Sequence, residues 1–364
     1  MFKKYRVLKW TLVTIFSLIA GLFLFGIWFA SLIPPKDDLL ESTSASDLSY
    51  LSEQKVPYRG KILAVVTSTD VMGSSGKRTG YELTELARAY YVFEANGFEV
   101  DIASPLGGTP PVVIDDDDMG PFDFAFLNDP QAQAKTANTI PINDVVPEDY
   151  QAVFFAGGKG AMFDFPDNKA IQTIVRTYTE SNKVVGAVCH GPAALVNVRL
   201  KGGQLLLKNR TVSGFTNSEE LLLISDAESI FPFLLQSKMI EQGAQFNEGA
   251  MYLEKMSQDN NLITGQNPWS TWILAETMIK QLGYTPKYRE ITDEENAIKI
   301  LSIYETDGLR AAKDLLEEMS VKEMKPINRV LFAQHGVVGV MKGEMWRFID
   351  MMNLTSFAKK HEPE

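Results

Sequence analysis

The clearest chemistry in this chain comes from one cysteine and its neighbour. Cys189 is the only cysteine among 364 residues, and His190 follows it directly. A thiolate is a strong nucleophile and an adjacent imidazole can move protons, so the pair suits attack on a carbonyl carbon. A single cysteine also excludes a disulfide within the chain. The alternative is an inert core thiol, because free cysteines are among the most buried residues.

The residues around Cys189 predict the element that positions it. The preceding run, Val184–Val188, is apolar and rich in valine, which is typical of a buried parallel strand. Gly191 and Pro192 follow, and proline favours the first turn of a helix. Cys189 is therefore expected at a sharp bend between strand and helix, as in a nucleophile elbow. The N-terminus of that helix would lower the pKa of the thiol.

The rest of the central region predicts an α/β fold. Apolar runs predict strands at 61–67, 98–103, 150–155 and 211–213, and 262–268 fits a last strand with its turn. Helices are predicted at 81–95, 168–181 and 270–281. Alternation of strands and helices favours a parallel sheet with right-handed crossovers, here a flavodoxin-like, doubly wound one. The segment 121–147 has an irregular pattern that allows a short helix at 132–137, and such an insertion commonly covers a pocket.

The motif around the cysteine resembles a known family. The run from Val188 to Ala193, after an apolar strand, is similar to the ThiJ/PfpI family of the class I glutamine amidotransferase-like superfamily. Other matching segments extend from Lys61 to Gly283, and the longer insertions resemble the branch that contains glyoxalase III and heat-shock holdase chaperones. The resemblance implies a cysteine-dependent site that uses no cofactor.

The resemblance also implies roles for residues outside the elbow. It assigns to Glu85 the buried carboxylic acid that hydrogen-bonds the nucleophile, and Glu82, one turn earlier, is the local alternative. Either glutamate could instead be an ordinary solvated residue of a helix. The backbone N–H groups of Gly158 and His190 would form the oxyanion hole.

The acid that orients the catalytic histidine is expected at the start of a later helix. Matching residue by residue places it on Glu220, and Glu219 is one position away. A glutamate at a helix start also compensates the helix dipole, which is the alternative for both residues.

Two positions depart from the family's pattern. Lys159 stands where the family usually has histidine, and its fixed positive charge is expected to affect substrate choice and binding. Arg88-Ala89 stands where the family often has His-Pro, so the helix that carries the acid could enter the pocket differently.

Composition narrows the classes of partner. The net charge is −11, and no basic stripe occurs outside the first ten residues, which argues against nucleic-acid binding. The histidines at 190, 335 and 361 lie far apart in the sequence, so no metal site is expected. The acidic run Asp115–Asp118 lacks the alternating ligands and turn glycine of a calcium loop and predicts a solvated loop.

The amino-terminal segment predicts a membrane anchor. Trp10–Ile33 carries no charge, and about 24 helical residues at 1.5 Å each exceed the 30 Å hydrocarbon core. A cleavable signal peptide is the alternative, although its apolar core is usually shorter. Residues 1–9 are basic and are expected to stay cytoplasmic, which places the catalytic domain outside the cytoplasm, as in a bacterial cell envelope. Residues 34–56 are polar and serine-rich, like a tether.

We expect a catalytic domain at 57–284 and a helical extension at 285–364. Helical patterns in the extension occur at 297–304, 309–319, 328–341 and 344–352. They resemble a degenerate tetratricopeptide-type array. The extension could pack on the catalytic domain as a plain appendage, or form a surface for a homodimer or another partner.

Three functions from different classes fit these features. The first is an enzyme of small reactive carbonyls, in which Cys189 attacks the aldehyde of methylglyoxal while Glu85 and His190 move protons through an enediol to give lactate. The second is an amidase or peptidase that uses the same cysteine. Glutaminase chemistry is disfavoured, because the Gly-x-Cys-x-Gly elbow and distant His-Pro-Glu are missing. The third is a stress holdase that binds unfolded chains. We expect the carbonyl enzyme.

Overall fold

The computed structural model describes residues 2–35, 39–115 and 119–362, with the side chains of 2–8 and 22 left undescribed. The chain divides into two compact units, Asp38–Ile291 and Met1–Asp37 together with Thr292–Glu364. Apart from Asp115, the acidic run predicted as a solvated loop lies outside the described residues.

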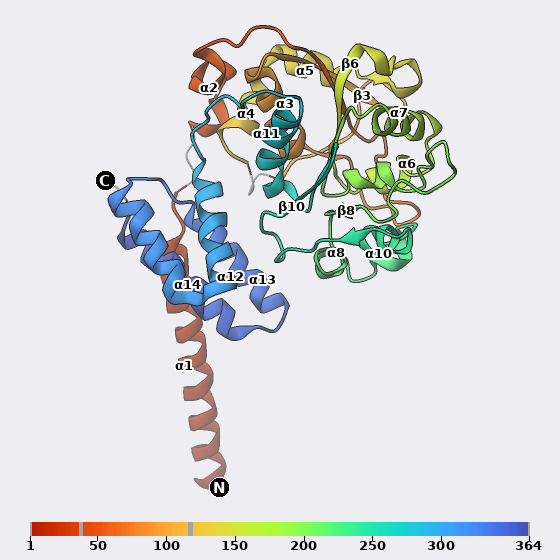
Figure 1. Ribbon diagram of the computed structural model, residues 1–364. Coiled ribbons are helices and arrows are strands. Elements are labelled where there is room, and N and C mark those ends of the chain that lie inside the picture. Colours follow the sequence, from red (N-terminus) through yellow and green to blue (C-terminus); the bar gives the residue numbers. More distant parts are fainter. Residues whose placement is uncertain (1, 36–38, 116–118, 363–364) are drawn as a thin grey trace. The chain divides into compact units, whose positions relative to one another are not determined.

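The unit Asp38–Ile291 is organised around one large sheet (Figure 1). Within the described residues this sheet has seven strands, in the order β10-β11-β7-β6-β1-β3-β5. Their bounds are β1 Gly60–Val65, β3 Phe98–Ser104, β5 Ile140–Pro141, β6 Tyr150–Phe155, β7 Val184–Val188, β10 Met256–Asp259 and β11 Leu262–Gly265. Neighbouring strands are parallel except for β10 and β11, which are antiparallel. The residues of β7 are all buried, as expected of a strand covered on both faces.

Helices and two short sheets surround the large sheet. The helices of this unit are α2 Ser49–Ser52, α3 Leu83–Ala95, α4 Pro121–Asn128, α5 Pro130–Ala137, α6 Ala161–Asp164, α7 Lys169–Glu180, α8 Asn217–Leu223, α9 Ala227–Ile230, α10 Leu235–Glu241 and α11 Thr271–Gln281. The short parallel sheets pair β2 Tyr81–Glu82 with β4 Val112–Val113, and β8 Thr211–Val212 with β9 Gln245–Phe246. Helices α3 and α11 pack against each other, on the other side of the large sheet from α7 (Figure 1).

The predicted α/β class, with a mostly parallel sheet, is confirmed, and the differences are local. The strand predicted at 211–213 lies outside the large sheet, because it pairs with β9. The segment 121–147 is more regular than predicted, since it forms α4 as well as α5. Pro121 occupies the first turn of α4, and the Asp123 carboxylate accepts the backbone N–H of Gly120 at 2.9 Å, which caps that helix.

The second unit contains the predicted helical extension. Its helices are α1 Phe2–Leu32, α12 Asp293–Glu317, α13 Arg329–Met341 and α14 Met345–Lys360. The patterns at 297–304 and 309–319 predict separate helices. Both fall in α12, except that residues 318–319 lie in the π-helical turn that follows it, and Gly308 with φ of 83° breaks the helical backbone between them. Gly343, at the predicted turn between α13 and α14, has φ of 77°.

Helix α1 contains a long apolar segment. Lys9–Leu32 has a mean hydropathy of 2.4 over its most apolar window and is long enough to cross a membrane by length and composition. An amino-terminal signal sequence has the same properties, so the segment by itself is weak support for an anchor.

Candidate active site

Cys189 stands at a sharp bend directly after β7. Its φ is 57°, a left-handed conformation that costs a non-glycine residue about 1–3 kcal/mol. Neighbouring segments hold the bend from both sides, because the Cys189 N–H donates to the Gly265 carbonyl at 3.0 Å and its carbonyl accepts the Phe215 N–H at 2.9 Å. The predicted bend is therefore present, and its strain is supported by the surrounding backbone.

The predicted helix after the bend is not an α-helix. Gly191–Leu195 forms a 3-10 helix, which ends where Val196 becomes extended. Gly191 is required there, since a β-carbon at this position would collide with the Phe155 carbonyl at the end of β6. So short a helix contributes little dipole, and the prediction that a helix N-terminus lowers the pKa of Cys189 is wrong. Burial raises the pKa of this thiol.

Glu85 reaches the site from the first turn of α3. Its side chain is fully buried, and its Oε2 accepts the Gly157 N–H at 2.6 Å. A β-carbon at Gly157 would lie 2.7 Å from Oε2 of Glu85 and 2.8 Å from the His190 nitrogen. The glycine therefore allows the glutamate, the loop after β6 and the elbow to converge.

The Glu85 carboxyl and the Cys189 thiol form a coupled pair. Burial raises the pKa of Glu85 well above its usual value, and the Glu82 charge raises it further. The hydrogen bonds from Gly157 and Cys189 act in the opposite direction but do not outweigh burial. Burial and then the charge of Glu85 raise the pKa of Cys189. The two groups therefore hold at least one proton between them at neutral pH, so a thiolate would be accompanied by a protonated Glu85.

Glu82 occupies a different place from its sequence neighbour. It lies at the N-cap of α3, is half-buried, and uses its backbone N–H to bond the Gly157 carbonyl at 3.2 Å. Its charge reaches Glu85 and Cys189 only as a repulsion that raises their pKa values. Of the two glutamates, Glu85 is the one that the fold brings to the thiol.

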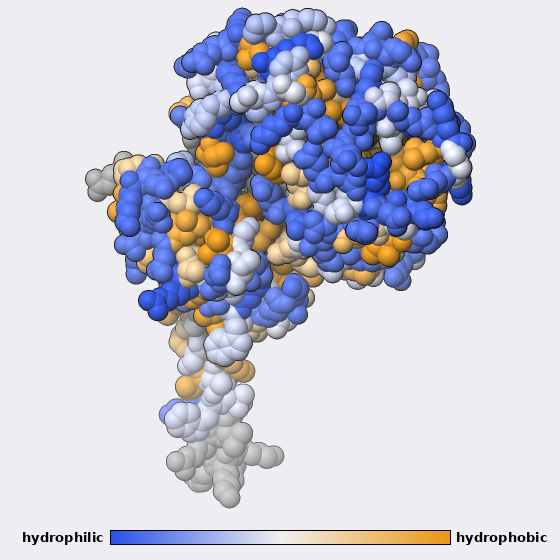
Figure 2. Space-filling view, in the orientation of Figure 1, coloured by the Kyte–Doolittle hydropathy of each residue, from blue (hydrophilic) through white to orange (hydrophobic). Residues whose placement is uncertain are grey.

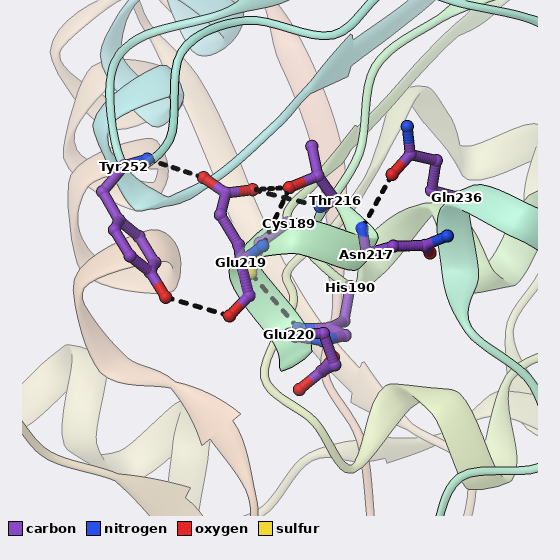
Figure 3. Close-up of polar contacts among 8 residues, drawn as sticks. All are labelled: Cys189, His190, Thr216, Asn217, Glu219, Glu220, Gln236 and Tyr252. Carbon is purple, nitrogen blue, oxygen red and sulfur yellow. Dashed lines mark hydrogen bonds and ion pairs between the residues drawn. The ribbon is translucent and has the colours of Figure 1, made fainter. Parts of the chain in front are cut away.

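His190 links the thiol to a second carboxylate. Its Nδ1 lies 3.3 Å from the Cys189 sulfur, and its Nε2 lies 2.6 Å from Oε2 of Glu220 (Figure 3). Burial alone would raise the pKa of Glu220, but the His190 charge and hydrogen bond, with help from Lys159, lower it. An ionised Glu220 accepts the Nε2 proton, which leaves Nδ1 free to accept a proton from sulfur.

Glu219 points away from the histidine. Figure 3 shows its carboxylate directed at Thr216 and Tyr252. Its bonds come from the N–H groups of Thr216 and Tyr252 and from the side-chain amides of Gln266 and Asn267. Since these partners occupy both carboxylate oxygens, Glu219 holds the loop around Tyr252, and Glu220 is the residue placed on His190.

The loop after β6 carries the remaining predicted residues. Gly158 has φ of 95°, and a β-carbon there would collide with the Gly80 carbonyl. Lys159 is half-buried, and its charge lowers the pKa values of both Cys189 and Glu220. In the part of the chain that the structure describes, no carboxylate lies within 4.0 Å of its ammonium. Lys159 is thus a cation whose field reaches the thiol.

Some residues around the site have no clear signal in the sequence. The His190 ring lies 4.5 Å from the Phe215 ring and 6.4 Å from that of Phe231, centroid to centroid. Asp164 accepts the Thr67 hydroxyl at 2.8 Å and the Ser68 N–H at 2.7 Å, and burial raises its pKa to about 6. Asp164 thereby connects the residues after β1 to α6.

Metal ligands are not grouped anywhere in the described ranges 2–35, 39–115 and 119–362: no three His, Cys, Asp or Glu side chains there could jointly hold an ion. The residues of the candidate site come from the carboxyl ends of β6 and β7, from α3 and from α8. In the large sheet, β3 lies on one side of β1 and β6 on the other, so the strand order reverses direction at β1. The carboxyl ends of the strands at such a point are where an α/β sheet typically binds its ligand.

Comparison with known proteins identifies relatives of this unit. The model of the DJ-1/PfpI family matches residues 77–281. Glyoxalase 3 of Candida albicans is 30% identical over 234 residues, which cover 60% of this chain and 96% of that protein. Glutathione-independent glyoxalase HSP31 of Saccharomyces cerevisiae is 31% identical over 236 residues, or 61% and 97% of the two chains.

Solved structures agree with this assignment. Rapid Encystment Protein 24 kDa of Francisella tularensis superimposes with a TM-score of 0.58 and 35% identity, over 62% of this chain and 99% of that one. Glyoxalase III of Candida albicans superimposes with a TM-score of 0.57 and 29% identity, over 61% and 97%. The family match lies entirely within the unit Asp38–Ile291 and leaves out α1 and the helical extension.

Proposed function

Because the chain belongs to the DJ-1/PfpI family, we propose that it is a cysteine-dependent enzyme of the glyoxalase III type. It converts a 2-oxoaldehyde and water into a 2-hydroxy acid. The observation that carries the proposal is the placement of the strained Cys189 between the Glu85 carboxyl and the His190 imidazole. The names of the relatives in Candida albicans and Saccharomyces cerevisiae, both glyoxalases, support the same reaction.

The first step is addition of the thiolate to the aldehyde carbon. Nδ1 of His190 faces the sulfur and takes its proton, and the ionised Glu220 stabilises the resulting imidazolium. The C–S bond forms as the carbonyl π bond becomes an alkoxide. The N–H groups of Gly158 and His190 would hold that alkoxide until a proton converts it into a hemithioacetal.

The second step moves a hydrogen within the substrate. Removal of the proton from C1 and protonation of the C2 oxygen give an enediol. Loss of the proton from the C1 oxygen and protonation of C2 then give the thioester of the 2-hydroxy acid. C1 is oxidised and C2 is reduced, so the step needs no external oxidant. Glu85 suits this transfer, because its buried carboxyl can give its proton to the alkoxide of the first step and then, as the carboxylate, take the C1 proton and return it to C2. Water finally cleaves the thioester, which frees the acid and restores the thiol.

Lys159 supplies the contact that would discriminate among substrates. Its side chain is half-buried, and its positive charge acts to lower the pKa of the Cys189 thiol. A fixed positive charge favours a carbonyl compound with a negative substituent over a neutral one.

A substrate panel tests the reaction class. The full chain, in detergent, is assayed with 2-oxoaldehydes, amides and esters beside Cys189→Ala, with a client-aggregation assay in parallel. We expect 2-oxoaldehyde loss with a matching yield of 2-hydroxy acid, and none for the variant. Amide or ester turnover alone would indicate the amidase chemistry. Suppressed aggregation in both proteins without any turnover would refute the enzyme.

The apolar segment of α1 supports a second proposal, membrane anchoring with the catalytic unit outside the cytoplasm. Lys9–Leu32 spans about 36 Å as a helix, enough for a bilayer core of 30 Å. The basic residues of segment 1–9 favour a cytoplasmic amino end. Intact mass of the membrane-extracted chain distinguishes an anchor from a cleaved signal. Reporters fused after Glu364 should be active only on the outer side, and a reporter active in the cytoplasm would contradict this topology.

A further inference from the structure

The hairpin of α13 and α14 ends in a group of exposed apolar side chains. This hairpin tip consists of Val337, Val340, Met341, Met345, Trp346 and Ile349. Trp346 is 81% exposed and Met345 is 55% exposed, in a position that no packing within the described residues explains. Figure 2 shows hydrophobic surface on this helical unit, beside the stalk formed by α1. Exposed apolar groups gathered in one place usually mark a contact surface.

The hairpin lies alongside the apolar segment of α1. At its open end, the Arg329 Nε donates to the Leu32 carbonyl at 2.7 Å, and the Lys359 ammonium donates to the Ser31 carbonyl. Further along α14, the Phe348 ring lies 6.3 Å from the Phe25 ring. Helix α13 therefore begins, and α14 ends, level with the carboxyl end of α1, and the turn between them points toward the amino end of α1.

These contacts place the tip at a depth along α1. Phe25 precedes Leu32 by seven residues, so the Phe348 contact lies about 10 Å below the end of the apolar segment. Met345 is one further turn along α14, roughly 4–5 Å deeper. The apolar segment exceeds the hydrocarbon core by only about 6 Å. In a membrane, the tip would thus lie roughly 9–15 Å below the surface of the core, within the leaflet next to the carboxyl end of α1.

The chemistry of the tip suits contact with lipid. Trp346 is an amphipathic side chain of the kind enriched at membrane interfaces, and methionine adapts to acyl chains. The charged residues next to it are paired within the unit, Lys342 with Glu344 at 2.7 Å and Arg347 with Glu305 at 2.5 Å. Pairing reduces the cost of bringing these charges to an interface.

We propose that the hairpin tip inserts into the outer leaflet of the bilayer that α1 crosses. This inference rests on the anchor proposed above. It makes the helical extension a second membrane contact, independent of the catalytic chemistry.

Site-specific fluorescence in vesicles tests the proposal. The full chain carrying Cys189→Ala is labelled with the fluorophore NBD at a single new cysteine and reconstituted in phosphatidylcholine. The variants are Met345→Cys at the tip, Lys360→Cys at the other end of α14, and Leu18→Cys within the apolar segment. All three positions are exposed, so the substitutions should leave the fold intact. Nitroxide on the lipid acyl chains quenches probes inside the bilayer, and iodide quenches probes in water.

We expect lipid nitroxide to quench the probes at 345 and 18, with blue-shifted emission, and iodide to quench only the probe at 360. If 18 is quenched by nitroxide but 345 by iodide, the tip proposal is overturned and the anchor stands. If 345 is shielded from both quenchers, the tip contacts protein and the proposal is also overturned. Iodide quenching at 18 would overturn the anchor and, with it, the inserted tip.

Discussion

Replacement of Glu85 by glutamine separates proton transfer from positioning. In the native site Oε2 accepts the Gly157 N–H at 2.6 Å, and the carboxyl faces the Cys189 thiol. A glutamine can keep both contacts, since its carbonyl accepts from Gly157 and its NH₂ group donates to sulfur. It cannot give up a proton and recover it. Glu85→Gln should therefore preserve the geometry and remove the chemistry.

The size of the effect follows from that difference. Loss of one positioned acid–base group lowers the rate by about 10²–10⁴, equivalent to roughly 3–5 kcal/mol of transition-state stabilisation. Because the bond to Gly157 survives, the free energy of unfolding near pH 4 should change by no more than about 1 kcal/mol. Glu85→Ala is the matched contrast, since it leaves the buried Gly157 N–H without its acceptor, at a cost of about 1–3 kcal/mol.

The same substitution changes the pH dependence of stability. Burial raises the pKa of folded Glu85 above the value of 4.5 expected in the unfolded chain. A raised pKa contributes stability that is fully present below 4.5 and is lost as the pH rises through the folded-state pKa. Glu85→Gln lacks this loss, so its stability relative to the native protein should increase with pH.

Steady-state turnover of a 2-oxoaldehyde and urea unfolding at several pH values measure these effects. Turnover by Glu85→Gln within tenfold of the native rate, beside an inactive Cys189→Ala, would show that Glu85 carries no essential proton. A stability difference that is constant with pH would show that Glu85 is ionised in the folded site.

Four further substitutions give separate tests. Cys189→Ala should abolish turnover with little change in melting temperature, which circular dichroism can follow. Glu220→Gln should lower kcat less than Glu85→Gln, because Glu220 acts through His190 and exchanges no proton with the substrate. Lys159→His should lower the ratio of kcat/KM for anionic over neutral aldehydes while the Cys189 reaction persists. Burial raises the pKa of Asp164 from 3.8 to about 6, so the native protein should lose about 3 kcal/mol of its free energy of unfolding as the pH rises from 4 to 6. Asp164→Asn should remove this loss and flatten the pH dependence of stability over that range.

Much of the fold could be predicted from local patterns. The predicted strand at 150–155 coincides with β6, and the helix predicted at 168–181 becomes α7, with Asn168 and Ser181 as its caps. These elements carry strong signals, because buried parallel strands are continuous apolar runs and helices have capping residues. The 121–147 insertion was harder to predict, since α4 depends on a cap between Gly120 and Asp123 rather than on a clear period.

The sequence also contains a signal that separates Glu219 from Glu220, but this signal can be interpreted only once the fold is known. Thr216 and Glu219 have capping-box spacing, and in the structure each side chain bonds the other's backbone N–H. A glutamate engaged in a cap is not free to orient a histidine. The next residue, Glu220, lies about 100° around α8, which turns it from the cap toward His190.

The protonation of the site could not be predicted from the sequence, because it depends on burial and on contacts between distant segments. A helix N-terminus beside Cys189 predicts a lowered pKa, yet the helix is a short 3-10 turn, and the fold buries the thiol beside Glu85, more than a hundred residues earlier. In the proposed mechanism, the thiol therefore reacts because a neighbouring group can accept its proton, and not because its pKa is low. In that mechanism, Nδ1 of His190 accepts that proton and Glu220 stabilises the resulting cation. With Glu85 still protonated, a thiolate can form without placing two adjacent negative charges in the buried site.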